Sequence, residues 1–149
     1  MNIDEKIAML TSSDNKQAYN ALKDLIAISE ENNRVYYYFD KFVEMMNDKS
    51  NSYIRTRGLR LIAFNSKWDK KNKVNLIIEE YLKHIEDEKP ITSRQCIKNI
   101  VIIAKNKPEL IQTILVELEK FDRIYEDSMQ SLIYKDRKKA IRQIRQFIW

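Results

Sequence analysis

Residues that could carry chemistry are scarce in this 149-residue sequence. His84 is its one histidine and Cys96 its one cysteine, so a zinc site near His84 would have to be built mostly from carboxylates, which is unusual. We expect His84 at the edge of the apolar face of a helix, with a metal-binding or acid–base role as the alternative. The sequence therefore predicts no metal site and no cofactor.

The carboxylates come mostly as neighbours in the sequence: Glu30 with Glu31, Glu79 with Glu80, and Glu86 with Asp87 and Glu88. Adjacent residues on a helix point in different directions, so none of these groups would bring two acids onto one substrate. A Gly-rich phosphate loop is excluded because Gly58 is the one glycine, and no Ser/His/Asp set is visible. We predict no catalytic residues and no small-molecule ligand.

Three consecutive tyrosines, Tyr36, Tyr37 and Tyr38, lie in the densest aromatic stretch of the chain. They span most of a helical turn, so at least one ring must face away from the core, where it could offer an amphipathic contact to a partner. Packing against neighbouring helices is the alternative. These tyrosines are the predicted aromatic binding residues.

A second stretch alternates basic and aromatic side chains at steps of three and four residues: Tyr53, Arg57, Arg60, Phe64 and Lys67. This spacing places them on one face of a helix, opposite the apolar residues of the same segment. Such a face suits phosphates or an acidic protein. The alternative is an ordinary solvated outer face.

Composition favours a helical protein. One glycine and two prolines leave few of the tight turns that β-hairpins need. With 33% charged and 44% hydrophobic residues the chain resembles neither a disordered nor a membrane protein, and its longest aliphatic run, residues 100–104, is far shorter than the roughly 20 residues that cross a bilayer. The acidic N-terminus does not resemble a signal peptide and a single cysteine agrees with a reducing compartment, so we expect a cytoplasmic protein.

Apolar residues recur at helical steps through most of the chain. We predict helices and no strand, over residues 3–11, 14–31, 34–48, 52–67, 70–87, 92–106, 108–122 and 127–147. Three helix starts carry a short acceptor followed three residues later by glutamine: Asp14 with Gln17, Thr92 with Gln95, and Asp127 with Gln130. Ile91 and Cys96 have the spacing of a hydrophobic staple at the second start, and Pro90 and Pro108 stand at segment openings.

A five-residue word recurs along the chain: a small residue, an apolar one, a basic one, any residue, and an apolar one. Its copies begin at Ala21, Gly58, Cys96 and Ala140, at spacings of 37, 38 and 44 residues. Each of the first three copies is followed by a break and a second amphipathic helix, which makes a unit of about forty residues. The fourth copy comes late, so either the last helix is unusually long or residues 134–136 break it. With this repeat, the chain resembles the HEAT-like repeat family over nearly its whole length.

This resemblance implies an all-α fold, a right-handed α-α superhelix of about three and a half helix pairs, in a single domain over residues 1–149. The small residue of each word would let the first helices of neighbouring repeats approach closely, and Cys96 would then be a buried small residue rather than a reactive thiol. The basic residues of the words, with three neighbours, would form a basic column along the solenoid: Lys23, Arg57, Arg60, Lys67, Lys98, Lys105 and Arg142.

Such repeat proteins resemble scaffolds more than enzymes, so the resemblance implies a non-enzymatic scaffold that binds another protein in the groove of its second helices. Nucleic acid is the alternative partner, because one HEAT-like family comprises DNA glycosylases for alkylated bases. That function would need a catalytic acid framed by aromatics, and Trp68 with Asp69 is the one tryptophan–acid neighbour pair. Residues 1–50 have a net charge of −3 and residues 51–149 of +8, so an acidic partner should favour the later repeats.

Overall fold

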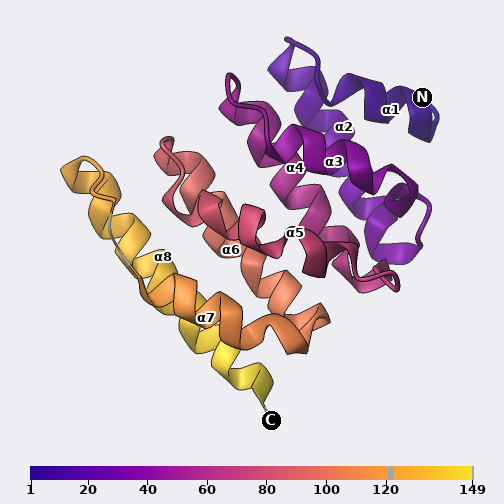
Figure 1. Ribbon diagram of the computed structural model, residues 1–149. Coiled ribbons are helices and arrows are strands. Elements are labelled where there is room, and N and C mark those ends of the chain that lie inside the picture. Colours follow the sequence, from indigo (N-terminus) through magenta and orange to yellow (C-terminus); the bar gives the residue numbers. More distant parts are fainter. Residues whose placement is uncertain (121–122, 149) are drawn as a thin grey trace. The chain divides into compact units, whose positions relative to one another are not determined.

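The protein is all-helical. The computed structural model describes residues 1–120 and 123–148, and no strand is found within these ranges. The chain packs as two compact units, residues 1–71 and 72–149 (Figure 1). A single domain over residues 1–149 stays a prediction, and both Trp149 and the end of the predicted helix 108–122 lie outside the described residues.

The first unit contains four α-helices: α1 (Ile3–Met9), α2 (Asn15–Glu31), α3 (Phe39–Met46) and α4 (Ser52–Asn65). A 3₁₀ turn, Val35–Tyr38, leads into α3, and another, Ser66–Trp68, continues α4. The helix α4 packs against both α3 and α2, and α1 packs against α2. The predicted segments 3–11, 14–31, 34–48 and 52–67 are therefore confirmed as helical, with one part of each of the last two wound as 3₁₀ turns.

The described part of the second unit contains four further helices: α5 (Lys73–Leu82), α6 (Pro90–Asn106), α7 (Ile111–Glu119) and α8 (Asp127–Arg145). The 3₁₀ turns Lys83–Glu86, Pro108–Leu110 and Gln146–Ile148 adjoin α5, α7 and α8. The helix α6 packs against α8 and α7, and α7 also packs against α8. Since α8 is continuous, the last helix is long, and residues 134–136 do not break it.

The repeated word has the same orientation in all four helices that carry it. Its small residue is buried in each copy, at Ala21, Gly58, Cys96 and Ala140. The apolar residue at the fifth position is buried in all four copies, whereas no basic residue at the third position is buried. Within each unit the two helices with the word pack together, α2 with α4 and α6 with α8. The recurrence in sequence is thus a recurrence of buried and outward-facing positions.

Gly58 marks a very close contact between α4 and α3. A Cβ atom placed on it would lie 2.7 Å from the backbone nitrogen of Met46 and 2.7 Å from the carbonyl oxygen of Phe42, closer than van der Waals contact allows. Both atoms belong to α3. The small residue therefore allows α4 to approach α3, which is the second helix of the preceding helix pair. The expectation that it allows two first helices to approach each other is wrong at this position.

The helix starts follow the predicted caps in one case of three. Asp14 caps α2, because its carboxylate accepts the backbone N–H groups of Lys16 and Gln17, each at 3.1 Å. The prediction for Thr92 is wrong, since α6 begins at Pro90 and Thr92 is buried inside it. The staple is wrong as well, because Ile91 is exposed. Proline at the first helical position is preorganised for the helix, which moves the start two residues earlier.

The N-cap of the last helix lies one residue before the predicted cap, Asp127. Glu126 is the N-cap of α8, and Asp127 is its first helical residue. Gln130 reaches back beyond the cap, where its Oε1 accepts the backbone N–H of Tyr125 at 2.9 Å. The glutamine therefore satisfies a backbone donor, as a capping box would, but in the segment that precedes the helix.

Candidate binding surfaces

The tyrosine stretch is turned outward by the turn that precedes α3. Asn32 Oδ1 accepts the backbone N–H of Arg34 at 3.1 Å and its Nε–H at 3.2 Å, which bends the chain after α2. Val35 and Phe39 are then buried on either side of the 3₁₀ turn. With these two residues fixed in the core, the side chain of Tyr37 lies on the opposite side and is 86% exposed.

Tyr37 and Tyr38 form an aromatic pair at the surface. Their ring centroids are 5.2 Å apart with an interplanar angle of 82°, the edge-to-face arrangement that aromatic rings prefer. The pair borders an open depression of about 500 Å³, the aromatic pocket, whose lining residues are Asn2, Ile3, Asp4, Arg34, Tyr37 and Tyr38. A lining that combines two aromatic rings with one basic and one acidic side chain suits an apolar or aromatic side chain flanked by polar groups.

Tyr36 has a different role from its two neighbours. Its hydroxyl donates a hydrogen bond of 2.5 Å to Asp69 Oδ1, and its ring lies 5.5 Å from that of Phe39. Burial, together with the Asp69 carboxylate, raises the pKa of Tyr36 well above its ordinary value. Tyr36 thus joins the start of α3 to the end of the first unit and does not line the pocket.

The predicted stripe on α4 is only partly a surface. Tyr53 and Lys67 are exposed, Arg60 and Phe64 are half-buried, and Arg57 is 5% exposed. Arg60 Nε is buried and has no hydrogen-bond partner among the described residues. A continuous basic and aromatic face along α4 is therefore not present.

Arg57 corrects the expectation of an outward-facing arginine. Its guanidinium donates hydrogen bonds of 2.8 Å to the backbone oxygen of Leu10 and to Asn15 Oδ1. Desolvation lowers the pKa of Arg57 from its ordinary value, which is the sign of a cation held inside the protein. Arg57 therefore ties α4 to the connection between α1 and α2.

The other basic-column residues of the first unit interact with their own neighbours. Lys23 places its Nζ 5.3 Å from the ring centre of Tyr19. Lys67 donates a 2.5 Å hydrogen bond to the backbone oxygen of Glu30, at the end of α2. Both lysines are exposed, and Lys23 lies on a helix that packs against the one that carries Arg60. Part of their hydrogen-bonding capacity and positive charge is thus already used within the unit.

The basic-column residues of the second unit are less engaged. Lys98 and Lys105 lie on α6 and Arg142 on α8, and all three side chains are exposed. None of them forms an ion pair with another described residue. Since α6 and α8 pack together, Lys98 and Arg142 lie on neighbouring helices.

The tryptophan–acid pair is part of the framework of the first unit. Trp68 Nε1 donates a 2.6 Å hydrogen bond to the backbone oxygen of Ser29. Asp69 is buried and accepts the hydroxyl of Tyr36. A catalytic acid must reach a substrate, whereas this carboxylate faces a tyrosine of its own unit. The pair holds the end of α4 against the C-terminal end of α2 and the turn before α3.

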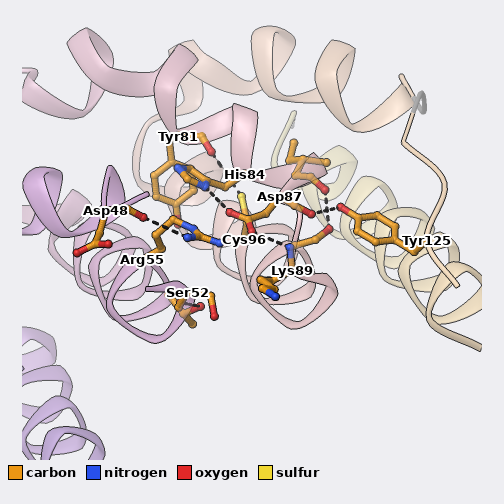
Figure 2. A network of polar contacts seen from close by, with 12 residues as sticks. Asp48, Ser52, Arg55, Tyr81, His84, Asp87, Lys89, Cys96 and Tyr125 are labelled. Atoms are coloured by element: carbon orange, nitrogen blue, oxygen red, sulfur yellow. Dashed lines mark hydrogen bonds and ion pairs between the residues drawn. The ribbon is translucent and has the colours of Figure 1, made fainter. Parts of the chain in front are cut away.

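A polar network surrounds Asp87 in the second unit (Figure 2). Asp87 Oδ2 lies 2.8 Å from His84 Nδ1, Oδ1 accepts the backbone N–H of Lys89 at 2.9 Å, and the backbone oxygen of Asp87 accepts the hydroxyl of Tyr125 at 2.5 Å. His84 is partly buried, close to the expected edge position. The network fixes the turn between α5 and α6 and attaches the segment before α8 to it.

The serine and the cysteine near this network are buried, and each contacts a backbone oxygen. The Ser93 hydroxyl donates to the backbone oxygen of Ile85 at 2.5 Å, and the Cys96 thiol lies 3.6 Å from the backbone oxygen of Tyr81. Burial raises the pKa of the Cys96 thiol well above its ordinary value, so the thiol stays protonated. Among the described residues no cluster of histidine, cysteine and carboxylate could hold a metal ion, and no helix could cross a membrane.

The helix α8 carries a surface that the word-based analysis missed. Five of its basic side chains are exposed: Lys135, Lys138, Lys139, Arg142 and Arg145. Only Arg142 belongs to the repeated word. The signal was nevertheless present, because six of the eleven residues 135–145 are lysine or arginine, and their spacing leaves five of them on one side of a helix.

No family model, no curated protein and no solved structure matches this chain.

Proposed function

We propose that the chain is a non-enzymatic, HEAT-like helical scaffold whose function is to bind another protein. The proposal includes a right-handed superhelix built from the helix pairs that the repeated word marks. Its support is the common orientation of the four words and the packing of α2 with α4 and of α6 with α8. Helical repeats of this kind expose long surfaces and use them for binding.

The observation that carries the protein-binding proposal is the aromatic pocket. Tyrosine and arginine are among the residue types that contribute most to protein interfaces, and the pocket combines Tyr37, Tyr38 and Arg34. An exposed ring that is already packed edge-to-face on a neighbour loses little freedom on binding. Tyr37 is thus suited to anchor a partner, although it contributes little to the core.

The environment of the chemistry-bearing residues supports a non-enzymatic role. Asp69 bonds to Tyr36, the Asp87 carboxylate to His84 and a backbone amide, and Cys96 is a buried, protonated thiol. Each of these groups stabilises a local connection of the fold. We therefore place the function of the protein in its surface.

Affinity capture from cells that make the protein tests this proposal. The bait is the full chain in three forms: wild type, Tyr37→Ala, and Tyr53→Ala as a matched control. Tyr53 is also a surface tyrosine, 61% exposed, but it lies on α4 outside the pocket. Quantitative mass spectrometry should find a protein that wild type and Tyr53→Ala retain equally and that Tyr37→Ala loses by about tenfold or more, the effect of removing an interface anchor.

Three identical sets of captured proteins would contradict the proposal. A protein lost equally from both tyrosine variants would also contradict it, because the binding site would then not be the pocket. Circular dichroism of the three baits should give the same helix content and melting temperature, since neither tyrosine is buried.

A further inference from the structure

The basic residues of α8 point in two directions, one toward the interior of the second unit and five toward solvent. Arg137 is buried and donates a 3.2 Å hydrogen bond to the backbone oxygen of Glu117 on α7. The other basic residues between positions 135 and 145 are exposed and form the α8 basic face: Lys135, Lys138, Lys139, Arg142 and Arg145. One arginine thus packs inside the second unit, and five basic side chains face solvent.

Helix geometry concentrates these cations on a narrow strip. Ile133, Ala140 and Ile144 are buried and define the inner side of α8. At 3.6 residues per turn, Lys135 and Arg142 point roughly opposite to that side, and the other three cations flank them. With a rise of 1.5 Å per residue, the strip from Lys135 to Arg145 is about 15 Å long. Five positive charges therefore lie within a length comparable to a few nucleotides.

Few acidic groups neutralise the α8 basic face. The one acidic residue between positions 133 and 145 is Asp136, and it is turned toward α6, where Arg94 Nε lies 2.6 Å from its Oδ2. Arg145 pairs with Glu119 at 3.1 Å, both side chains being exposed. Lys135, Lys139 and Arg142 form no ion pair with any described residue.

An exposed aromatic ring adjoins the strip. Tyr134 is exposed, and the Nζ of Lys138 lies 4.9 Å from its ring centre. A ring at the edge of a basic strip can stack on a base whose phosphate contacts the neighbouring cations. Polyglutamate or an anionic bilayer would use the charges but not the ring. The apolar side of α8 is buried in the second unit, so this helix cannot insert into a bilayer as an amphipathic helix would.

We propose that the α8 basic face binds single-stranded nucleic acid, with its cations on successive phosphates and Tyr134 stacked on a base. This site lies in the second unit and is independent of the protein-binding pocket proposed for the first. It needs no base-specific contact, so binding is tolerant of sequence and strongly dependent on salt.

Fluorescence anisotropy with labelled 12-nucleotide oligo(U) and oligo(dT) tests the proposal on the full chain. Binding is measured from 25 to 300 mM NaCl, a range of about one log unit that we choose for the assay. Each phosphate contact on a single strand contributes about 0.7 to the slope of log K against log salt. Three to five contacts give a slope of about 2 to 3.5, with micromolar or tighter affinity at the lowest salt.

Two pairs of matched variants locate the site. The double variant Lys135→Glu, Arg142→Glu should lose at least about tenfold in affinity. The slope of log K against log salt should become smaller by about 1.4, because two phosphate contacts are lost. The control Lys49→Glu, Lys70→Glu makes the same change in net charge at two exposed lysines of the first unit and should bind within about twofold of wild type. Tyr134→Ala should lose about fivefold or more through stacking, whereas Tyr53→Ala should not.

Several outcomes overturn the proposal. One is the absence of binding at 25 mM NaCl, and another is an equal loss in both double variants, which would indicate charge attraction without a site. Equal affinity for a polyglutamate peptide or for phosphatidylserine vesicles would assign the face to an acidic protein or a lipid surface instead. If the Tyr134→Ala variant bound the oligonucleotides as tightly as wild type, the proposed stacking of a base of single-stranded nucleic acid on Tyr134 would be wrong. Circular dichroism of each variant confirms that the fold is retained.

Discussion

The two compact units have similar net charges and each buries two of its cations, but the second gathers five exposed cations on one helix. Residues 1–71 contain 12 Lys/Arg and 10 Asp/Glu, a net charge of +2, and residues 72–149 contain 15 and 12, a net charge of +3. In the first unit Arg55 and Arg57 are buried and donate to backbone oxygens, and Lys67 bonds to the end of α2 (Figure 2 shows Arg55). In the second unit, the helix α8 exposes five lysine and arginine side chains. Formal charge therefore predicts the surface only after burial is known.

The tyrosines of the two units also have different surroundings. The first unit exposes Tyr37 beside the half-buried Tyr38, over an open pocket with a single arginine. In the second unit Tyr81 and Tyr125 are buried, and burial raises the pKa of both phenols, whereas Tyr134 is exposed beside the α8 basic face. The two surfaces therefore differ in chemistry, one being aromatic and the other basic.

The largest effect is expected at Gly58. Replacement by leucine puts a side chain where even a Cβ would overlap the α3 backbone, so the first unit should lose about 3 kcal/mol of unfolding free energy, at the upper end of overpacking costs. Ala27→Leu, on the exposed side of α2, is the matched control and should change stability by no more than about 0.5 kcal/mol. Urea unfolding followed by circular dichroism measures both. A neutral Gly58→Leu variant would mean that the α3–α4 contact is wrong.

The same variant tests whether the units unfold together. Cys96 is the one thiol and is buried in the second unit, so its rate of reaction with a disulfide reagent reports the opening of that unit. Because we predict one cooperative domain, Gly58→Leu should accelerate the labelling of Cys96. An unchanged rate would show that the second unit opens independently of the first.

A smaller effect is expected when the buried and exposed arginines are compared directly. Arg57→Met leaves the backbone oxygen of Leu10 and the side chain of Asn15 without their donor, so it should cost about 2 kcal/mol. Arg142→Met removes an exposed cation and should cost at most about 0.5 kcal/mol. Thermal melting of the two variants measures the difference. Equal costs would contradict the division between internal and external cations.

The smallest effect is expected for the basic column. Arg60→Glu with Lys98→Glu makes the same change in net charge as the reversal on α8, but neither residue lies on the α8 basic face. Oligonucleotide affinity should therefore change by about twofold or less, measured by the same anisotropy titration. A loss as large as that of the α8 variant would extend the nucleic-acid site along the column.

The sequence predicted the helices well because apolar spacing depends on local geometry. It failed where a distant group decides the outcome. Nothing local shows that the side chain of Arg57 bonds to the carbonyl of Leu10, 47 positions earlier in the chain. The start of α6 was misplaced because Pro90 opens the helix and Asp87 holds the preceding backbone, an arrangement stronger than the pattern of Thr92 and Gln95.

The candidate sites were predictable to different degrees. That one of three consecutive tyrosines must face outward follows from helix geometry, but which one depends on the burial of Val35 and Phe39. The α8 basic face follows from spacing alone, but the repeated word does not reveal it, because only Arg142 occupies the repeated position. The pocket beside Tyr37 could not be predicted, since its other wall comes from the first residues of the chain.

The contact at Gly58 also has a consequence for the order of folding. Only residues 47–51 separate α3 from α4, so the two helices can meet after closing a short loop, which takes well under a microsecond for about ten residues. Contacts that are near in sequence form early. The α3–α4 hairpin is therefore where we expect the transition state of the first unit to be most structured, with α2 added later through its longer-range contact with α4. Gly58→Ala should then slow refolding more than it speeds unfolding.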